Sequence, residues 1–271
     1  MPARAKNVFL TGASSGIGAA IAQALCAAGH RVWGSSRDLN KLPPLASFRP
    51  VALDLLDPNS VNRAFAETLR ESGGLDVMIN NAGSGHFGPA EELSAETIQD
   101  QFQVLVFSHI QLMQLALAAM RERDHGVIIN VTSLAARLPV PFMAAYNAAK
   151  AAMAAFTMSA QLELGDTRVR IVDLQPADIS TAFNRAVIKS DPADPRSAAR
   201  LAQTWEIIER NMAAAPGPEL VARHVLRLIE QTNPPALLTV GDLFQSKIAP
   251  FLLRFLPQRV RLWGLKKYYK L

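Results

Sequence analysis

The sequence predicts a single-domain α/β protein with a doubly wound, parallel, seven-stranded sheet and helices on both faces. Short runs that are apolar on both faces alternate along the 271 residues with longer amphipathic segments. A glycine-rich turn joins the first run to the first such segment, and no Pro/Gly/Ser-rich linker divides the chain. Strands that are apolar on both faces indicate a parallel sheet covered by helices on each side.

The order of the elements follows from the periodicity of apolar residues. Strands are expected at Asn7 to Thr11, Arg31 to Ser35, Val51 to Leu53, Asp76 to Asn80, Val127 to Val131, Val169 to Leu174 and Leu237 to Val240. Helices are expected at Gly16 to Ala28, Pro58 to Glu71, Ala95 to Glu122, Met143 to Gly165 and Glu219 to Glu230.

One region breaks the alternation. Residues 184–218 contain the pairs Asp191-Pro192 and Asp194-Pro195, and they are expected to form an insertion over the edge of the sheet that carries the site. The predicted organisation is therefore a domain over residues 1–246 with this insertion, followed by a basic and apolar C-terminal segment, residues 247–271.

Composition excludes several classes of protein. With 49% hydrophobic and 19% charged residues, the chain can bury a core, and disorder is not expected. No uninterrupted apolar run approaches the roughly 18 residues of a membrane span, so neither a signal peptide nor a transmembrane helix is expected. The single cysteine, Cys26, cannot form an intrachain disulfide, which favours a reducing, cytoplasmic location.

The net charge of +5 is concentrated at the C-terminal end. Seven cations and no acids follow Asp242, and removing them from the total leaves −2 for residues 1–246. A nucleic-acid-binding domain would present a basic face, so no nucleic-acid partner is expected. The seven are Lys247, Arg254, Arg259, Arg261, Lys266, Lys267 and Lys270.

The turn from Thr11 to Gly18 is typical of a nucleotide-binding site. Glycines let the backbone turn tightly and approach a pyrophosphate, while the N-terminus of the following helix offers unpaired N–H groups. A lone glycine pattern is also found in ordinary strand-to-helix turns, but its place at the first βα junction favours a dinucleotide. The predicted ligands are Gly12, Ser14, Ser15, Gly16, Ile17 and Gly18.

The end of the second predicted strand favours NADP(H) over NAD(H). A dinucleotide without a 2′-phosphate usually meets a carboxylate there, whereas a 2′-phosphate requires hydroxyls or a cation. Ser36 takes the place of the acid, and Arg37 can pair bidentately with a phosphate. The alternative is that Arg37 is a solvated loop charge whose partner is Asp38.

Further cofactor contacts are expected after the third and fourth strands. Asp54, followed by Leu55, can accept a hydrogen bond from the adenine amine, and the small Ala82-Gly83 pair allows close approach to the adenine ribose. Asn81 is expected to brace the sheet at the same edge.

The residues Ser133, Tyr146 and Lys150 predict acid/base chemistry. Tyr146 and Lys150 are four residues apart and so share one helix face. A tyrosine has a pKa of about 10, and a neighbouring ammonium would stabilise the phenolate, which makes Tyr146 a candidate general acid and base. Ser133, at the end of the fifth strand, could orient the substrate oxygen.

These motifs resemble those of the short-chain dehydrogenase/reductase family, in its single-domain, Rossmann-like branch, as far as about Gly241. The resemblance implies that Tyr146 protonates the carbonyl during reduction, that Ser133 positions it, and that Lys150 holds the nicotinamide ribose and lowers the pKa of Tyr146. It further implies dimers or tetramers built through the two long helices. The matching motifs are Thr11 to Gly18, Asn80 to Gly83, Ser133, Tyr146 with Lys150, and Pro176 to Thr181, in which Ile179 and Thr181 would contact the carboxamide.

Two positions depart from the family pattern. Leu105 stands where family members often carry an Asn that holds a water linking the lysine to solvent, so Gln103, Ser108 or another path would have to substitute, or turnover is slow. Ala177 stands where Gly often follows Pro176, and we expect it to shift the nicotinamide loop slightly.

The insertion carries apolar residues that predict a lid over a lipophilic substrate. Such stripes are also typical of plain helix core. These residues are Phe183, Val187, Ile188, Leu201, Trp205, Ile207, Ile208 and Met212.

The C-terminal segment mixes apolar residues, Ile248 to Leu256, with cations, as interfacial helices do. One hypothesis is peripheral attachment to an anionic membrane, giving access to a steroid-, retinoid- or acyl-type ketone. The alternative is a docking segment in an oligomer.

Two function classes remain. The first is an NADP(H)-dependent oxidoreductase acting on a hydrophobic ketone or secondary alcohol. The second is a nucleotide-binding scaffold or regulatory protein with weak turnover, because Leu105 replaces the relay Asn. No metal site is expected, since the five histidines and Cys26 lack the spacing of metal ligands. Only His86 is expected near the substrate cleft, with an exposed loop position as the alternative.

Overall fold

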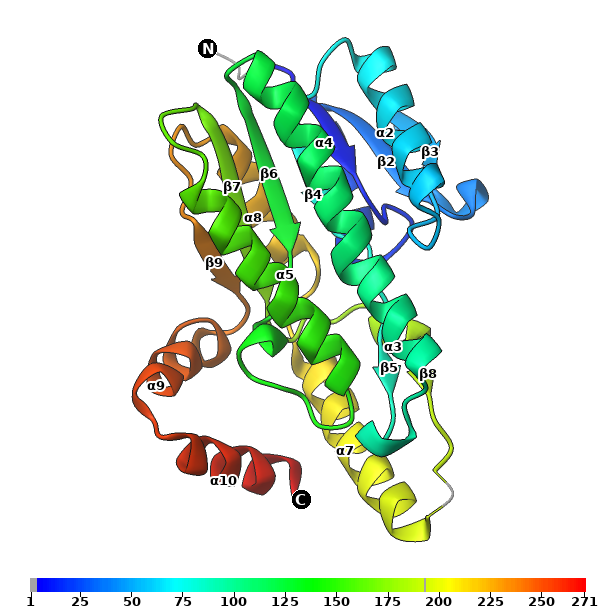
Figure 1. Cartoon of the computed structure of the whole chain (residues 1–271), viewed down its shortest axis with the longest axis vertical. Coiled ribbons are helices and arrows are strands. Elements are labelled where there is room, and N and C mark those ends of the chain that lie inside the picture. Colours follow the sequence, from blue (N-terminus) through cyan, green and yellow to red (C-terminus); the bar gives the residue numbers. More distant parts are fainter. Residues whose placement is uncertain (1–3, 193) are drawn as a thin grey trace.

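The computed structural model describes residues 4–192 and 194–271, apart from the side chains of residues 253 and 254. Seven strands form one parallel sheet in the order β3-β2-β1-β4-β6-β7-β9 (Figure 1). The chain starts at the middle of the sheet, builds one half, and returns to build the other, as expected for a doubly wound fold. The strands are β1 (Asn7–Leu10), β2 (Arg31–Ser36), β3 (Phe48–Ala52), β4 (Val77–Asn80), β6 (Gly126–Val131), β7 (Val169–Pro176) and β9 (Leu237–Val240).

The predicted fold class is confirmed. The strands are apolar throughout because helices bury both faces of the sheet. In β1, Val8 and Leu10 pack into the core under α1 (Gly16–Ala27) and α8 (Glu219–Glu230), while Phe9 packs into the opposite core. Successive side chains of a strand point to opposite faces, so a strand between two helix layers must be apolar throughout. The second layer consists of α2 (Pro58–Ser72), α4 (Ser108–Glu122) and α5 (Ala144–Leu162), in front of the sheet in Figure 1.

The helix expected at Ala95 to Glu122 is interrupted. It forms α3 (Ala95–Phe102), a π-helical turn at Gln103–Phe107, and α4. By length and composition alone, the 28-residue stretch Ala95–Glu122 could cross a membrane. Its apolar character is explained by the face of α4 that is buried against the sheet. Single π-helical turns inside α-helices are frequent at functional sites, which directs attention to residues 103–107.

The insertion is more ordered than the sequence predicted. Two short strands, β5 (His86–Phe87) and β8 (Ile188–Lys189), pair in parallel outside the main sheet, and α6 (Phe183–Ala186) precedes β8. The 20-residue helix α7 (Pro195–Ala214) follows, within the segment expected to form the insertion.

The pair Asp194-Pro195 begins α7. The Asp194 carboxylate accepts a hydrogen bond from the Ser197 N–H at 2.9 Å, and Pro195 occupies the first turn of the helix. An Asp-Pro pair is thus both a loop signal and a helix start signal, since Asp caps helices and Pro is favoured at the first helical position.

The chain after β9 forms an arm that leaves the edge of the sheet (Figure 1). The arm comprises a π-helical turn at Phe244–Ile248, α9 (Ala249–Phe255) and α10 (Gln258–Tyr269). Its last turn returns to the domain, because the Tyr268 hydroxyl accepts a hydrogen bond from the Asn211 side chain of α7 at 2.7 Å.

Candidate active site

A cleft of about 730 Å³ opens at the carboxyl ends of the parallel strands. Its walls are the turns that follow β1, β2, β3, β4, β6 and β7, together with the insertion and the end of α10. The neighbours β1 and β4 mark the place where the strand order reverses, which is where doubly wound sheets bind ligands. All the site residues predicted from the sequence line this cleft.

The glycines of the first turn are required by the packing around them. Gly12 has a φ of +72°, and a Cβ there would lie 2.8 Å from the Ala82 Cα. A Cβ on Gly18 would lie 2.0 Å from the carbonyl oxygen of Gly12. Ser15 occupies the N-cap of α1 without a side-chain hydrogen bond to the helix, so the N–H groups of the first turn remain for a phosphate. The turn therefore fits a dinucleotide.

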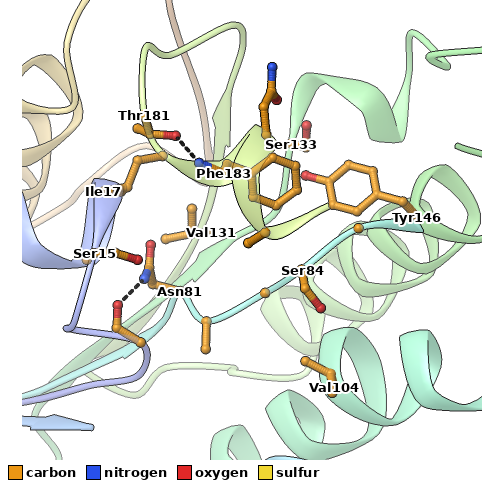
Figure 2. A pocket seen from close by; sticks show the side chains of 18 of the residues that line it. Ser15, Ile17, Asn81, Ser84, Val104, Val131, Ser133, Tyr146, Thr181 and Phe183 are labelled. Carbon is orange, nitrogen blue, oxygen red and sulfur yellow. Dashed lines mark hydrogen bonds between the residues drawn. The ribbon is translucent and has the colours of Figure 1, made fainter. Parts of the chain in front are cut away.

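Asn81 braces that turn from the neighbouring strand. Its side-chain amide donates to the Thr11 carbonyl at 3.0 Å, and the Thr11 hydroxyl accepts from the backbone N–H groups of Asn81 and Ala82 at 2.9 and 3.0 Å. Figure 2 shows Asn81 directed toward this turn. The bracing expected from the sequence is present, while Ala82 and Gly83 form the cleft wall beside it.

The edge of the cleft after β2 is basic. Arg37 and Lys41 both line it, and Asp38 forms its ion pair with Lys41 at 3.5 Å. The Ser36 hydroxyl accepts from the Asp38 N–H at 3.1 Å. Within the described part of the chain Arg37 takes part in no ion pair, so the alternative that Asp38 is its partner is not what the structure contains.

The other predicted cofactor residues lie on the walls of the same cleft. The Asp54 carboxylate accepts from the Leu56 N–H at 3.0 Å, and the Leu55 carbonyl accepts from the Ser108 hydroxyl. On the opposite side the Thr181 hydroxyl accepts from the Phe183 N–H at 3.2 Å (Figure 2). A Cβ on Gly16 would lie 3.4 Å from the Thr181 Cβ, which places the loop after β7 over the phosphate-binding turn. That loop follows Pro176, the last residue of β7, and contains the buried Ile179.

Ser133, Tyr146 and Lys150 meet at the centre of the cleft. Tyr146 and Lys150 project from one face of α5, and the hydroxyls of Ser133 and Tyr146 face one another in Figure 2. The Lys150 ammonium donates to the Val131 carbonyl at 2.8 Å and lies 5.8 Å from the centroid of the Tyr146 ring. This arrangement can hold a carbonyl oxygen between two hydroxyls, beside a cation.

Burial dominates the electrostatics of this group. It raises the pKa of Tyr146 above its ordinary value, and the Ser133 hydroxyl offsets part of that rise. Burial lowers the pKa of Lys150 to about 8, against the opposing attraction of Asp173. Burial and Ser133 set the direction of the Tyr146 pKa in the protein groups alone, and its lowering by Lys150 beside a bound dinucleotide stays a prediction. Tyr146 is protonated at neutral pH, as a proton donor must be.

The sequence reasoning missed a carboxylate that acts on Lys150. Asp173 lies on β7, accepts hydrogen bonds from the Thr132 hydroxyl and from the Gln175 side chain, and attracts the Lys150 ammonium. Burial is the largest influence on Asp173 and raises its pKa. A signal was available, because an acid inside a strand that is apolar on both faces must have polar partners.

The structure also identifies the surroundings of Leu105. This side chain is fully buried in the π-helical turn, next to Gly83. The Gln103 side chain donates to the Ser108 hydroxyl at 2.9 Å, and that hydroxyl donates to the Leu55 carbonyl. Gln103 and Ser108, the two residues expected to replace the relay Asn, therefore form hydrogen bonds that lead to Leu55, in the turn after β3.

His109, one turn beyond Leu105, is the polar side chain that sequence reasoning dismissed. Its imidazole hydrogen-bonds the Leu105 backbone, and its Nε2 atom is buried and has no partner among the described residues. Burial and the charge of Lys150 lower its pKa to about 3, so it is neutral in the folded protein. No motif spacing predicted this position, because only the fold places α4 beside Lys150.

The substrate side of the cleft is mainly apolar. The Phe183 ring lies 5.8 Å from that of Tyr146, and His86 contributes a buried Nδ1 atom without a partner in the described structure. The insertion combines the two expected roles. Val187, Leu201 and Trp205 are buried in a cluster with Phe87 and Met143, and Phe183 and Ile208 pack against that cluster. The apolar side chains of the insertion that line the cleft include Phe183, Ile188, Ile208 and Met212.

The fold and the site define a dinucleotide-dependent oxidoreductase. A model of the short chain dehydrogenases matches residues 6–192. The chain belongs to the short-chain dehydrogenase/reductase family, as its motifs predicted. It is an oxidoreductase that uses NAD(P) and acts on an alcohol or carbonyl group.

Similar proteins extend over the whole chain. A 3-ketodihydrosphingosine reductase of Bacteroides thetaiotaomicron is 28% identical over 264 residues, which cover 97% of each protein. A carbonyl reductase (NADPH) 2 of Sus scrofa is 32% identical over 191 residues, covering 69% of this chain and 76% of the relative.

Solved structures agree with this fold. A short-chain dehydrogenase from Streptomyces avermitilis superposes with a TM-score of 0.83 at 27% identity, covering 100% of this chain and 99% of the other. A Burkholderia cenocepacia member in complex with NADP gives 0.74 at 25% identity over 97% and 98%. A Burkholderia phymatum member in complex with NAD gives 0.81 at 22% identity over 97% and 96%, which supports the fold alone.

Proposed function

We propose that this protein is an NADP(H)-dependent oxidoreductase of hydrophobic ketones or secondary alcohols. One observation carries the proposal: the cleft that contains Ser133 and Tyr146 is lined both by the cations Arg37 and Lys41 and by apolar side chains of the insertion. Arg37 and Lys41 suit a 2′-phosphate, and the apolar side chains suit a lipid-, steroid- or retinoid-like carbonyl compound. The names of the two relatives, one for a long-chain keto lipid base and one for NADPH, support the same reading.

In the reductive direction the residues of the site act as an acid and its supports. A bound NADPH supplies the hydride that forms the new C–H bond at the carbonyl carbon. The Tyr146 hydroxyl donates its proton to the carbonyl oxygen, and the Ser133 hydroxyl holds that oxygen in place. The Lys150 ammonium then stabilises the Tyr146 phenolate until a proton returns from solvent.

The test is a panel of carbonyl substrates of graded size and polarity. Initial rates of NADPH oxidation are measured with long-chain 3-keto amines, steroid ketones and retinal, alongside small polar ketones. We expect kcat/KM to rise with the apolar surface of the substrate, since each buried methylene contributes about 0.8 kcal/mol. Equal kcat/KM for acetone-sized and lipid-sized ketones would contradict the assigned substrate class.

Arg37→Ala tests the cofactor assignment. Loss of a bidentate phosphate contact is expected to weaken NADPH binding roughly 10- to 100-fold while leaving NADH binding within about twofold. The dissociation constants of both nucleotides are measured by fluorescence titration. Arg70→Ala, on the exposed face of α2, is the matched control and should change neither constant. Equal losses for both nucleotides after Arg37→Ala would refute the 2′-phosphate assignment.

The scaffold alternative depends on Leu105. It predicts tight NADPH binding with a background rate on every substrate, equal to the rate of a Tyr146→Phe variant. The buried neutral Nε2 of His109 near Lys150 favours the enzyme, because a polar acceptor remains beside the lysine despite Leu105.

We also propose a dimer or tetramer built on α4 and α5. Exposed apolar side chains lie on α5 and on the π-helical turn before α4, as expected for a surface covered by a second subunit. They are Phe107, Phe156, Met158 and Leu162.

A further inference from the structure

The C-terminal arm concentrates exposed apolar surface. Among the residues whose exposure the structure describes, ten of the nineteen exposed large apolar or aromatic side chains lie between Leu243 and Tyr268. Soluble domains rarely leave apolar side chains gathered on one short segment unless the segment binds something. The ten are Leu243, Phe244, Ile248, Phe251, Leu252, Phe255, Val260, Leu262, Trp263 and Tyr268.

The same segment is basic and has no acid of its own. Lys247, Arg259, Arg261, Lys266, Lys267 and Lys270 are exposed and alternate with the apolar side chains, while the side chain of Arg254 lies outside the described residues. The Lys267 ammonium lies 5.3 Å from the centroid of the Trp263 ring, which is itself 64% exposed. Apolar and aromatic side chains mixed with cations match a bilayer interface with anionic headgroups.

Charge argues against a second copy of this chain as the occupant. A twofold contact apposes the same patch on both subunits, so the cations of one arm would face those of the other without acids between them. Like charges brought together in this way are destabilising. The exposed apolar side chains of α5 and of the π-helical turn before α4 offer a separate surface for a subunit contact, and that surface does not involve the arm.

We propose that residues 243–271 form an interfacial arm that binds the surface of an anionic membrane. Phe251 and Phe255, whose ring centroids lie 5.1 Å apart in an edge-to-face arrangement, and Trp263 would enter the headgroup region, while Lys266 and Lys267 contact the lipid phosphates. Because α9 has only 7 residues and α10 only 12, each is too short to span a bilayer, and the arm lies on the membrane.

The arm also forms part of the cleft. Tyr269 of α10 is buried and lines the cleft together with Ile208, Asn211 and Met212 of α7. Membrane contact through α10 would therefore hold the apolar part of the cleft next to the lipid. Entry of a membrane-dissolved substrate by this route rests on the proposed function, whereas membrane binding by the arm does not.

Sedimentation of the full-length protein with vesicles tests the proposal. Vesicles of phosphatidylcholine with 30% phosphatidylglycerol are compared with pure phosphatidylcholine vesicles, at low and at 0.5 M salt. We expect binding to the anionic vesicles that falls with salt. The double substitution Lys266→Gln/Lys267→Gln is expected to weaken binding at least about tenfold, since each cation near an anionic surface contributes substantially. Phe255→Ser and Trp263→Ser should each weaken it severalfold.

Matched variants outside the arm are the controls. Arg70→Gln on α2 and Phe107→Ser beside α4 remove an exposed cation and an exposed aromatic ring, and they should leave vesicle binding unchanged. Circular dichroism verifies that every variant is folded.

Binding that is equal for the arm variants and the wild type overturns the proposal. So does a loss of oligomer on size exclusion in the arm variants without any loss of vesicle binding, which would identify the arm as a subunit contact. Vesicle sedimentation and size exclusion do not depend on enzyme activity. A negative result for membrane binding is therefore distinct from a negative result for the proposed reaction.

Discussion

Replacing Tyr146 with Phe is expected to reduce the NADPH-dependent reduction rate by about 10²- to 10⁴-fold, the range typical of a lost general acid. The substitution keeps the ring that packs near Phe183 and removes the hydroxyl that faces Ser133. Because the pKa of Tyr146 is raised by burial, its hydroxyl carries the proton throughout the neutral range.

The measurement is kcat and kcat/KM on the best substrate of the panel, together with the dissociation constant for NADPH. The nucleotide affinity and the thermal midpoint should change little, since the ring contacts remain. A variant that retains more than a tenth of the wild-type kcat would show that the proton reaches the substrate by another route.

Lys150→Met is expected to lose activity and gain stability together. The folded protein holds the pKa of Lys150 at about 8, below the ordinary value of about 10.4, because burial disfavours the ammonium. Methionine has a similar shape and no charge to bury. It forfeits the hydrogen bond to the Val131 carbonyl, and we expect a net gain on the order of 1 to 2 kcal/mol in the free energy of unfolding at pH 7.

The sign of the pH dependence follows from the lowered pKa. Between about pH 8 and 10.4 the unfolded wild-type chain binds more protons at Lys150 than the folded protein does, so this lysine makes stability rise with pH across that window. Below pH 8 the full free-energy cost of burying the Lys150 ammonium is present. The advantage of Lys150→Met should therefore be largest at neutral pH and shrink toward pH 10.

Urea unfolding at pH 7.0 and pH 9.5 measures this difference, and NADPH oxidation gives the loss of activity, expected to be at least about 100-fold. Lys247→Met, at an exposed lysine of the arm, is the control and should change stability by less than about 0.5 kcal/mol at either pH. A Lys150→Met protein that is less stable than the wild type at pH 7 would show that the ammonium stabilises the fold.

Much of the fold could be predicted, because the strands between two helix layers leave a strong pattern. Each of the seven predicted strands is present within a few residues of its expected bounds. The helix α7 was not among the predicted elements, because Asp194 and Pro195 were noted as a break in the alternation although they begin a helix. The pair β5 and β8 was also missed, because two-residue strands far apart in the chain leave no periodicity.

The residues of the site also divide into those that the sequence could predict and those that it could not. Thr11 to Gly18 and Ser133 could be placed together from the sequence, because the carboxyl ends of parallel strands meet at one edge. Tyr146 and Lys150 were joined to them by the resemblance of their motif to that of the family. The influence of His109 and the place of Tyr269 in the cleft could not be predicted, since each depends on how its helix packs.

The sequence by itself determined the order of strands and helices, the dinucleotide-binding turn and the residues available for proton transfer. Local spacing is enough for these features, because hydrogen-bonded elements and close backbone turns impose their own residue patterns. The tertiary structure alone decided the protonation states, in which burial raises the pKa of Tyr146 and lowers that of Lys150. Desolvation depends on every neighbour that excludes water from a group, and those neighbours come from distant parts of the chain.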